Sequence, residues 1–146
     1  MTPKEMQART KAFAVRVIKL VGALPRGLAP QVIGRQLIRS ATSVGANYRA
    51  ACRAQSRAEF AAKLSIVVEE SDESLYWLEL VRETELIKPE LLSAIIKEAN
   101  ELVAIVLASR KTAKTQARSV NRQSTIDNRQ FSRSNENESK SKPLDR

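Results

Sequence analysis

The chain has 146 residues, which is enough for one domain that buries a core without a disulfide or a metal. It contains one cysteine and no histidine, and its 25 Lys and Arg residues against 16 Asp and Glu give a net charge of +9. A single Cys52 cannot form an internal disulfide, and a composition rich in Ala, Leu, Glu, Lys and Arg is typical of long helices rather than sheets.

The first predicted helix begins at Pro3, with Thr2 as its N-cap and Glu5 in its first turn. It ends in the segment 24–27, where proline and glycine occur together. Its apolar residues recur at helical spacing and comprise Met6, Phe13, Val17, Leu20, Val21 and Leu24. The other side carries three candidate contacts for an anionic partner, namely Lys11, Arg16 and Lys19.

The second predicted helix has Pro30 in its first turn and carries one apolar face and one arginine row. The apolar face consists of Ile33, Leu37, Ala41, Val44, Tyr48 and Ala51. The arginine row spans an arc of about 80° and consists of Arg35, Arg39, Arg49, Arg53 and Arg57. An i, i+4 row of guanidinium groups can bind phosphates, but the same row can also be a solvated face or pair with acidic residues of the third helix. Polar Ser40, Ser43 and Asn47 are interpreted as a structural cluster that fixes helix register.

The third predicted helix runs from about residue 57 to 84, after a capping box formed by Ser56 and Glu59. Its main apolar stripe is Phe60, Leu64, Val67, Val68, Ser71, Leu75 and Leu78. A second strip suggests a contact with another subunit or partner, through Ile66, Glu73, Tyr76, Trp77 and Leu80. The acidic run Glu69, Glu70, Asp72 and Glu73 is not expected to bind a metal, because di-metal helical bundles also use histidine.

The fourth predicted helix begins at Lys88-Pro89-Glu90 and fades near Lys111. Its core face is Leu92, Ile95, Ile96, Ala99, Leu102, Val103 and Val106. Residues 115–146 are rich in Ser, Asn, Gln, Arg and Lys, a composition that predicts disorder. We therefore expect an all-α, antiparallel up-down-up-down four-helix bundle over residues 1–114, followed by a disordered basic and polar tail over residues 115–146.

The charge is unevenly distributed along the chain. Residues 1–57 contain eleven Lys and Arg and one acid, whereas residues 58–87 contain two Lys and Arg and eight acids. This division favours attraction between helices and leaves positive charge for an anionic partner. No run of about 18 uncharged apolar residues is present, and the first residues do not resemble a secretory signal. We expect no membrane contact and a cytoplasmic location.

The segment 36–83 resembles the four-helix-bundle proteins encoded in intervening sequences of bacterial 23S ribosomal RNA genes, also called the S23-type ribosomal protein family. The resemblance rests on these features: Arg39-Ser40, Ser43-Val44-Gly45-Ala46-Asn47, Ser56, Glu59-Phe60, Lys63-Leu64-Ser65-Ile66, Glu70, Glu73 and Tyr76-Trp77-Leu78. It implies a homo-oligomer, often a pentamer, without known catalytic activity. Related accessory proteins of diversity-generating retroelements use a basic surface to engage reverse transcriptase and nucleic acid. Ala50 departs from the family pattern, which usually has Glu there.

The sequence favours a binding protein over an enzyme, because it has no histidine, no glycine-rich phosphate loop and no nucleophile motif. No cofactor is expected. The favoured hypothesis is an oligomer whose basic first two helices and basic tail contact RNA, DNA or another polyanion. The alternative is an oligomeric adaptor that recruits a protein through the acidic third helix and its aromatic pair.

Overall fold

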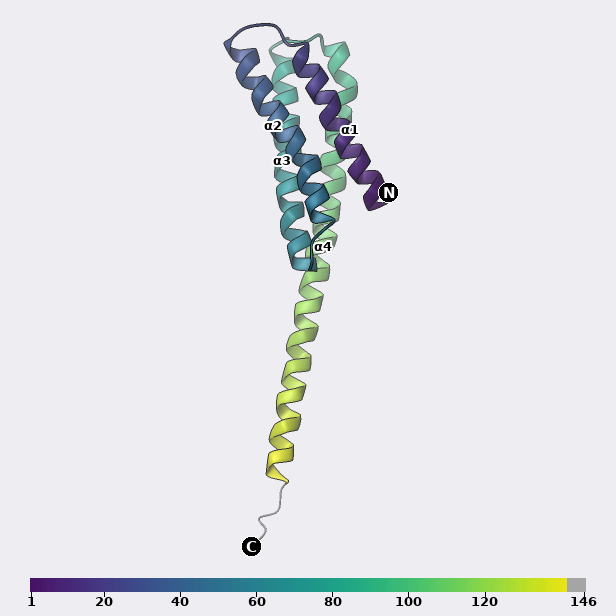
Figure 1. Cartoon of the computed structure of the whole chain (residues 1–146), viewed down its shortest axis with the longest axis vertical. Helices are drawn as coiled ribbons and strands as arrows, with labels where there is room; N and C mark the ends of the chain where they lie inside the picture. The colour runs from purple at the N-terminus through teal and green to yellow at the C-terminus, as the bar shows by residue number, and fades with distance from the viewer. Residues whose placement is uncertain (142–146) are drawn as a thin grey trace.

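Four antiparallel helices make up residues 1–141, the part of the chain that this computed structural model describes (Figure 1). They are α1 (Pro3–Gly22), α2 (Leu28–Ala51), α3 (Arg57–Glu83) and α4 (Pro89–Lys140). Each helix packs against the next one in sequence, and α4 returns to lie beside α1. The predicted all-α up-down-up-down bundle is confirmed.

Local capping explains where α1 and α3 begin. The Thr2 hydroxyl accepts from the Glu5 N–H at 3.1 Å, and the Glu5 carboxylate accepts from the Thr2 N–H at 2.6 Å. The Ser56 hydroxyl accepts from the Glu59 N–H at 3.0 Å. Both predicted starts are confirmed, and α2 begins at Leu28, which puts Pro30 in its first turn as predicted. Proline is tolerated throughout a first turn, so its position alone does not fix the first residue.

The core runs along the inner faces of all four helices and is built from the residues whose spacing predicted it. Fully buried members include Val17 of α1, Leu37 of α2, Leu64 of α3 and Leu102 of α4. Phe13 is the one aromatic side chain among the most deeply buried residues. Such aliphatic burial contributes roughly 1.5–3 kcal/mol for each large side chain, so the bundle needs no staple.

Small residues let α1 and α2 approach closely. A Cβ added to Gly45 would lie 3.5 Å from the backbone C and O atoms of Thr10, in ordinary contact. A Cβ added to Gly34 would lie only 3.0 Å from Val21 Cγ1. The backbones of α1 and α2 therefore lie close together, and the surface between the two helices is formed by small residues.

The structure differs from the prediction for the tail, because α4 continues as helix through Lys140. Neither Gly nor Pro interrupts residues 115–140, so nothing in the covalent backbone stops the helix there. The last buried residue is Ala113, and every described residue after Ala117 is exposed. We call residues 114–140 the α4 arm; its first part, as far as Asn121, lines a groove against α3, and the rest projects beyond the bundle (Figure 1). The predicted disorder of residues 142–146 lies outside the described residues.

Within the described residues, no helix combines the length and the apolarity that crossing a bilayer requires.

Candidate nucleic-acid interface

A basic groove of about 450 Å³ lies between α1 and α2. Its lining comes from α1, α2 and the turn after α2: Gln7, Ala8, Lys11, Ala14, Thr42, Gly45, Ala46, Arg49 and Arg53. Alanines and Gly45 keep the floor low, while Lys11, Arg49 and Arg53 are long, exposed cations. The structure therefore brings one predicted α1 cation together with two members of the arginine row.

These three cations have no carboxylate within ion-pair distance in residues 1–141. Their place in the fold accounts for this. Arg49 lies in the last turn of α2 and Arg53 in the turn that follows, and both line the groove against α1. The part of α1 that lines this groove, from Gln7 to Ala14, contributes no acid to the lining. The positive charge of the three cations remains available to a ligand.

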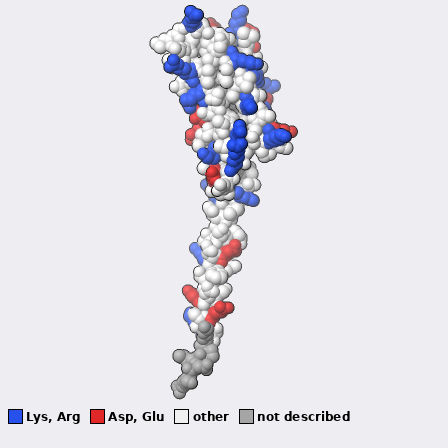
Figure 2. Space-filling model, viewed as in Figure 1, with Lys and Arg blue, Asp and Glu red and all other residues white. Residues whose placement is uncertain are grey.

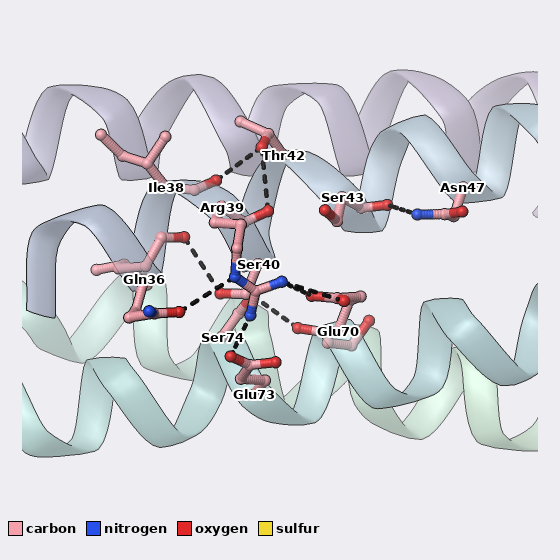
Figure 3. A network of polar contacts seen from close by, with 12 residues as sticks. Gln36, Ile38, Arg39, Ser40, Thr42, Ser43, Asn47, Glu70, Glu73 and Ser74 are labelled. Atoms are coloured by element: carbon pink, nitrogen blue, oxygen red, sulfur yellow. Dashed lines mark hydrogen bonds and ion pairs between the residues drawn. The ribbon is translucent and has the colours of Figure 1, made fainter.

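Arg39 belongs to the same row but is paired with α3 (Figure 3). Its Nη1 donates to both Glu70 oxygens at 3.2 and 3.3 Å, and its Nη2 donates to Glu73 Oε1. Its Nε donates to Gln36 Oε1 at 3.1 Å. Hydrogen bonding to Glu73 raises the pKa of Arg39 above its ordinary value. The arginine row is thus divided: Arg39 forms an ion pair with α3, whereas Arg49 and Arg53 have no carboxylate partner within residues 1–141.

The remaining predicted cations lie apart from the basic groove. Arg35 lines a second groove of about 600 Å³ beside the α1–α2 turn, together with Arg26. Arg57 stands at the start of α3 beside a third groove that includes Tyr48 and Phe60. Arg16 and Lys19 are exposed on α1. The eight predicted cations therefore do not form one surface.

The predicted α3 face contains an aromatic pair held by an acid. The rings of Tyr76 and Trp77 pack edge to face, with centroids 5.1 Å apart and planes at 69°. Trp77 Nε1 donates to Glu73 Oε1 at 3.2 Å. Tyr76 is 53 % exposed and Ile66 37 % exposed, whereas Trp77 and Leu80 are half-buried. This face leaves aromatic and aliphatic surface in solvent.

The three predicted polar-cluster residues do not form one cluster (Figure 3). Ser40 is fully buried, and its hydroxyl hydrogen-bonds that of Ser74 on α3 across 3.0 Å. Asn47 Nδ2 instead donates to the Ser43 carbonyl of its own helix at 2.9 Å. Sequence spacing on one helix could not identify Ser74, because it lies 34 residues away.

An ion pair between α1 and α4 was missed at the sequence level. Arg9 donates to the two Glu98 oxygens at 2.7 and 2.9 Å and to Glu101 at 2.5 Å. Hydrogen bonds from Arg9 lower the pKa of Glu98, although partial burial acts in the opposite direction. The i, i+3 spacing of Glu98 and Glu101 was the available signal, but its partner is 89 residues away in sequence.

Metal-ligating and nucleophilic side chains are dispersed. No group of three or more His, Cys, Asp or Glu residues is placed to hold a metal within residues 1–141. Glu70 and Glu73 of the acidic run are bound to Arg39. Burial, together with neighbouring Cys52, raises the pKa of Tyr48 to about 12. With that pKa, the Tyr48 hydroxyl stays protonated near neutral pH.

Comparison with known proteins identifies the family of the chain. The family model of the 23S rRNA-intervening sequence protein matches residues 4–109, which covers α1 to α3 and the first part of α4. The chain belongs to this family. A crystal structure of a protein with unknown function from the S23 ribosomal protein family of Bacteroides thetaiotaomicron VPI-5482 is 37 % identical, with a TM-score of 0.69. The alignment covers 76 % of this chain and 99 % of that chain. The search of curated proteins gave no match.

Proposed function

We propose that this family member is a nucleic-acid-binding protein rather than an enzyme, and that it binds the phosphate backbone of RNA or DNA in the basic groove. The supporting observation is that Lys11, Arg49 and Arg53 surround a floor of small residues and are not neutralised by acids of the described chain. Lys and Arg on the bundle's visible face (Figure 2) add attraction for a polyanion.

The groove lining favours the backbone of the nucleic acid over its bases. Arginine pairs bidentately with phosphate, and the alanine and glycine floor lets a strand approach the helices. The lining contains no aromatic side chain on which a base could stack. We therefore expect weak sequence preference and affinity that falls steeply as salt rises.

The test is fluorescence anisotropy with labelled single and double strands of RNA and DNA over a series of salt concentrations. The triple variant K11Q/R49Q/R53Q should bind at least about tenfold more weakly. The slope of its log affinity against log salt concentration should become shallower by an amount equal to the loss of about two to three phosphate contacts. The matched control is K4Q/R82Q/K97Q, which removes the same charge from exposed positions outside the groove. Equal losses in both variants, or salt-independent binding, would contradict the groove as the site.

We propose as a second function that the protein self-associates through the face of α3 formed by Ile66, Glu73, Tyr76, Trp77 and Leu80. The supporting observation is the exposed Tyr76 ring packed on Trp77, beside the partly exposed Ile66. Aromatic residues are enriched at the centres of protein interfaces, and resemblance to oligomeric relatives favours a second copy of this chain as occupant.

Sedimentation velocity over a concentration series tests self-association. The variant I66E/Y76E should sediment as a monomer under conditions where the natural chain is larger. The control V32E/L91E adds the same charge at exposed apolar positions on α2 and α4. A monomeric natural chain would exclude self-association and leave the α3 face as a surface for a different protein.

A further inference from the structure

The α4 arm carries one continuous basic stripe. At 100° per residue its cations fall within an arc of about 100°; they are Lys111, just before the arm, and Lys114, Arg118, Arg122, Arg129, Arg133 and Lys140. No carboxylate of residues 1–141 lies within ion-pair distance of any of them. Asp127 lies outside this arc, where its carboxylate accepts from Gln123 Nε2 at 2.9 Å, whereas Glu136 lies within it, three residues after Arg133. The stripe is therefore free of acids from Lys111 to Arg133.

The dimensions of the arm suit a duplex groove. From Arg122 to Arg133, beyond the residues that line a groove against α3, the helix rises about 17 Å, or about half a turn of B-form DNA at about 34 Å. An α-helix with side chains is about 10–12 Å wide, and the major groove of B-DNA is about 12 Å wide. The major groove of A-form RNA is too deep and narrow for side chains to read. A straight cationic helix thus fits DNA better than duplex RNA.

The face away from the stripe does not suit a membrane or a second helix. Its residues are small or polar, apart from Val120 and Phe131; they are Ala113, Ala117, Val120, Ser124, Asp127 and Phe131. A helix that lies in a membrane surface needs a broad apolar face. A coiled-coil seam needs apolar residues at successive core positions, whereas this face places Ser124 and Asp127 there. Charge is the arm's dominant recognition feature.

We propose that the α4 arm is a duplex-DNA-binding arm, whose basic stripe lies in the major groove and contacts phosphates on its two sides. This proposal shares nucleic acid as ligand with the proposed function, but it assigns a separate surface and a particular form of nucleic acid. The arm lies beyond residue 109, where the family match ends, so its role belongs to this chain and not to the shared bundle.

The test compares two full-length variants that change net charge equally. R118Q/R122Q/R129Q removes three cations from the stripe, whereas Q116E/S124E/S134E adds three negative charges on the other side of the same helix, at exposed positions about 140–220° around the axis from Lys111. Binding to labelled duplex DNA is measured by anisotropy between about 50 and 200 mM salt. With a loss of about 0.9 in the log–log salt slope per phosphate contact, the stripe variant should lose about 2.7.

The expected result is a loss of duplex-DNA affinity of at least about tenfold in the stripe variant and a smaller loss in the control. Equal losses would show attraction by net charge alone and would overturn the proposal. Unchanged DNA binding with reduced binding to vesicles of anionic lipid would overturn it in favour of a membrane surface. Duplex RNA bound as tightly as duplex DNA would overturn the groove assignment.

The groove variant K11Q/R49Q/R53Q, measured in the same assay, separates the two proposals. Loss of DNA binding in the groove variant alone leaves the proposed function intact and overturns the arm proposal. Loss in the stripe variant alone supports the arm and removes the basic groove as a DNA-binding site. Circular dichroism of all variants verifies that the bundle remains folded.

Discussion

At the scale of single residues, Glu73 connects the Trp77 side chain of α3 to the Arg39 side chain of α2. One carboxylate oxygen, Oε1, accepts from both Arg39 and Trp77. The hydrogen bond from Arg39 is the main reason that the pKa of Glu73 lies below its ordinary value of 4.5, and the bond from Trp77 adds to it. The position of the aromatic pair therefore depends on an ion pair with α2.

The fluorescence of Trp77 should report the ionisation of Glu73, because Trp77 is the only tryptophan of the chain. Its emission should change as pH falls through the lowered pKa of Glu73, with a midpoint below 4.5. Arg39→Gln should move this midpoint upward, since the main cause of the lowered pKa is then absent. Glu73→Gln should abolish the transition; its persistence would assign the signal to another group.

The Arg9–Glu98 pair should make stability depend on acid pH. Glu98 has a lowered pKa in the fold, so its contribution is present above about pH 4.5 and is lost as pH falls through the folded-state value. The pair joins α1 to α4, which otherwise contact each other less extensively than the other neighbouring helices do. Glu98→Gln should cost about 1 kcal/mol at neutral pH and flatten the acid loss of stability.

Urea unfolding at several pH values measures this effect. Glu69→Gln, at an exposed α3 position without an ion pair in residues 1–141, is the matched control. If both variants lost stability in parallel with the natural chain as pH fell, Glu98 would not be a source of the acid sensitivity.

At the scale of elements, the α1–α2 approach is set by small residues and can be tested at Gly45. Gly45→Ala should stabilise the protein by up to about 1 kcal/mol, because alanine favours helix and its Cβ meets Thr10 at an ordinary 3.5 Å. Gly45→Val should destabilise it, because its additional methyl groups would press on the α1 backbone. Thermal unfolding of both variants distinguishes them; destabilisation by alanine would show that the helices lie closer than 3.5 Å implies.

The sequence could predict helices but not the pairing of individual side chains between them. Spacing and caps identified α1 and α3 because both signals are local. The arginine row looked uniform, because a single helix over residues 35–57 would put all five on one arc; α2 instead ends at Ala51, so Arg53 lies in the turn and Arg57 begins α3. Whether a member meets an acid depends on the register of α2 against α3, which Ser40 and Ser74 reveal only after packing. Arg39 consequently faces Glu70 and Glu73, while Arg49 and Arg53 face the basic groove.

The arm is the element for which composition and structure disagree most. A polar composition predicted disorder, because such residues bury little apolar surface. Helix nevertheless needs only backbone hydrogen bonds and the absence of a breaker, and residues 115–140 meet both conditions. Tertiary packing does not support this part of α4, because every described residue after Ala117 is exposed, and a helix without such packing is only marginally stable in water.

Hydrogen exchange should consequently divide α4 into two parts. Amides around Leu92 to Val106 should be protected to nearly the global unfolding free energy, because this segment is buried in the core. Amides beyond Asn121 should exchange orders of magnitude faster in the free protein. If duplex DNA binds the arm, their protection should rise on addition of DNA. Strong protection of the free arm in a monomer would contradict an unsupported helix.

At the scale of the whole molecule, the thermal stability of the bundle should not depend on the part of the arm beyond Asn121. Side chains of α4 that line grooves against α3 extend as far as Asn121, and the last buried residue is Ala113. Terminating the chain after Asn121 should therefore leave the melting temperature of the bundle within about 2 °C of the full chain, since a change of 1 kcal/mol corresponds to several degrees. The far-UV helical signal should decrease with the residues removed.

Termination after Val106 is the informative comparison. It deletes Ala113, which is 3 % exposed, together with groove-lining residues that lie beside Tyr48 and Phe60. Loss of this packing should lower the melting temperature by several degrees or more. If the chain ending at Asn121 also melted several degrees lower, the arm would contribute to the fold, and its basic stripe would have a structural role in addition to any ligand. If only the shorter chain were destabilised, evolution could change the arm's charges without affecting the bundle, as expected for a surface that serves binding alone.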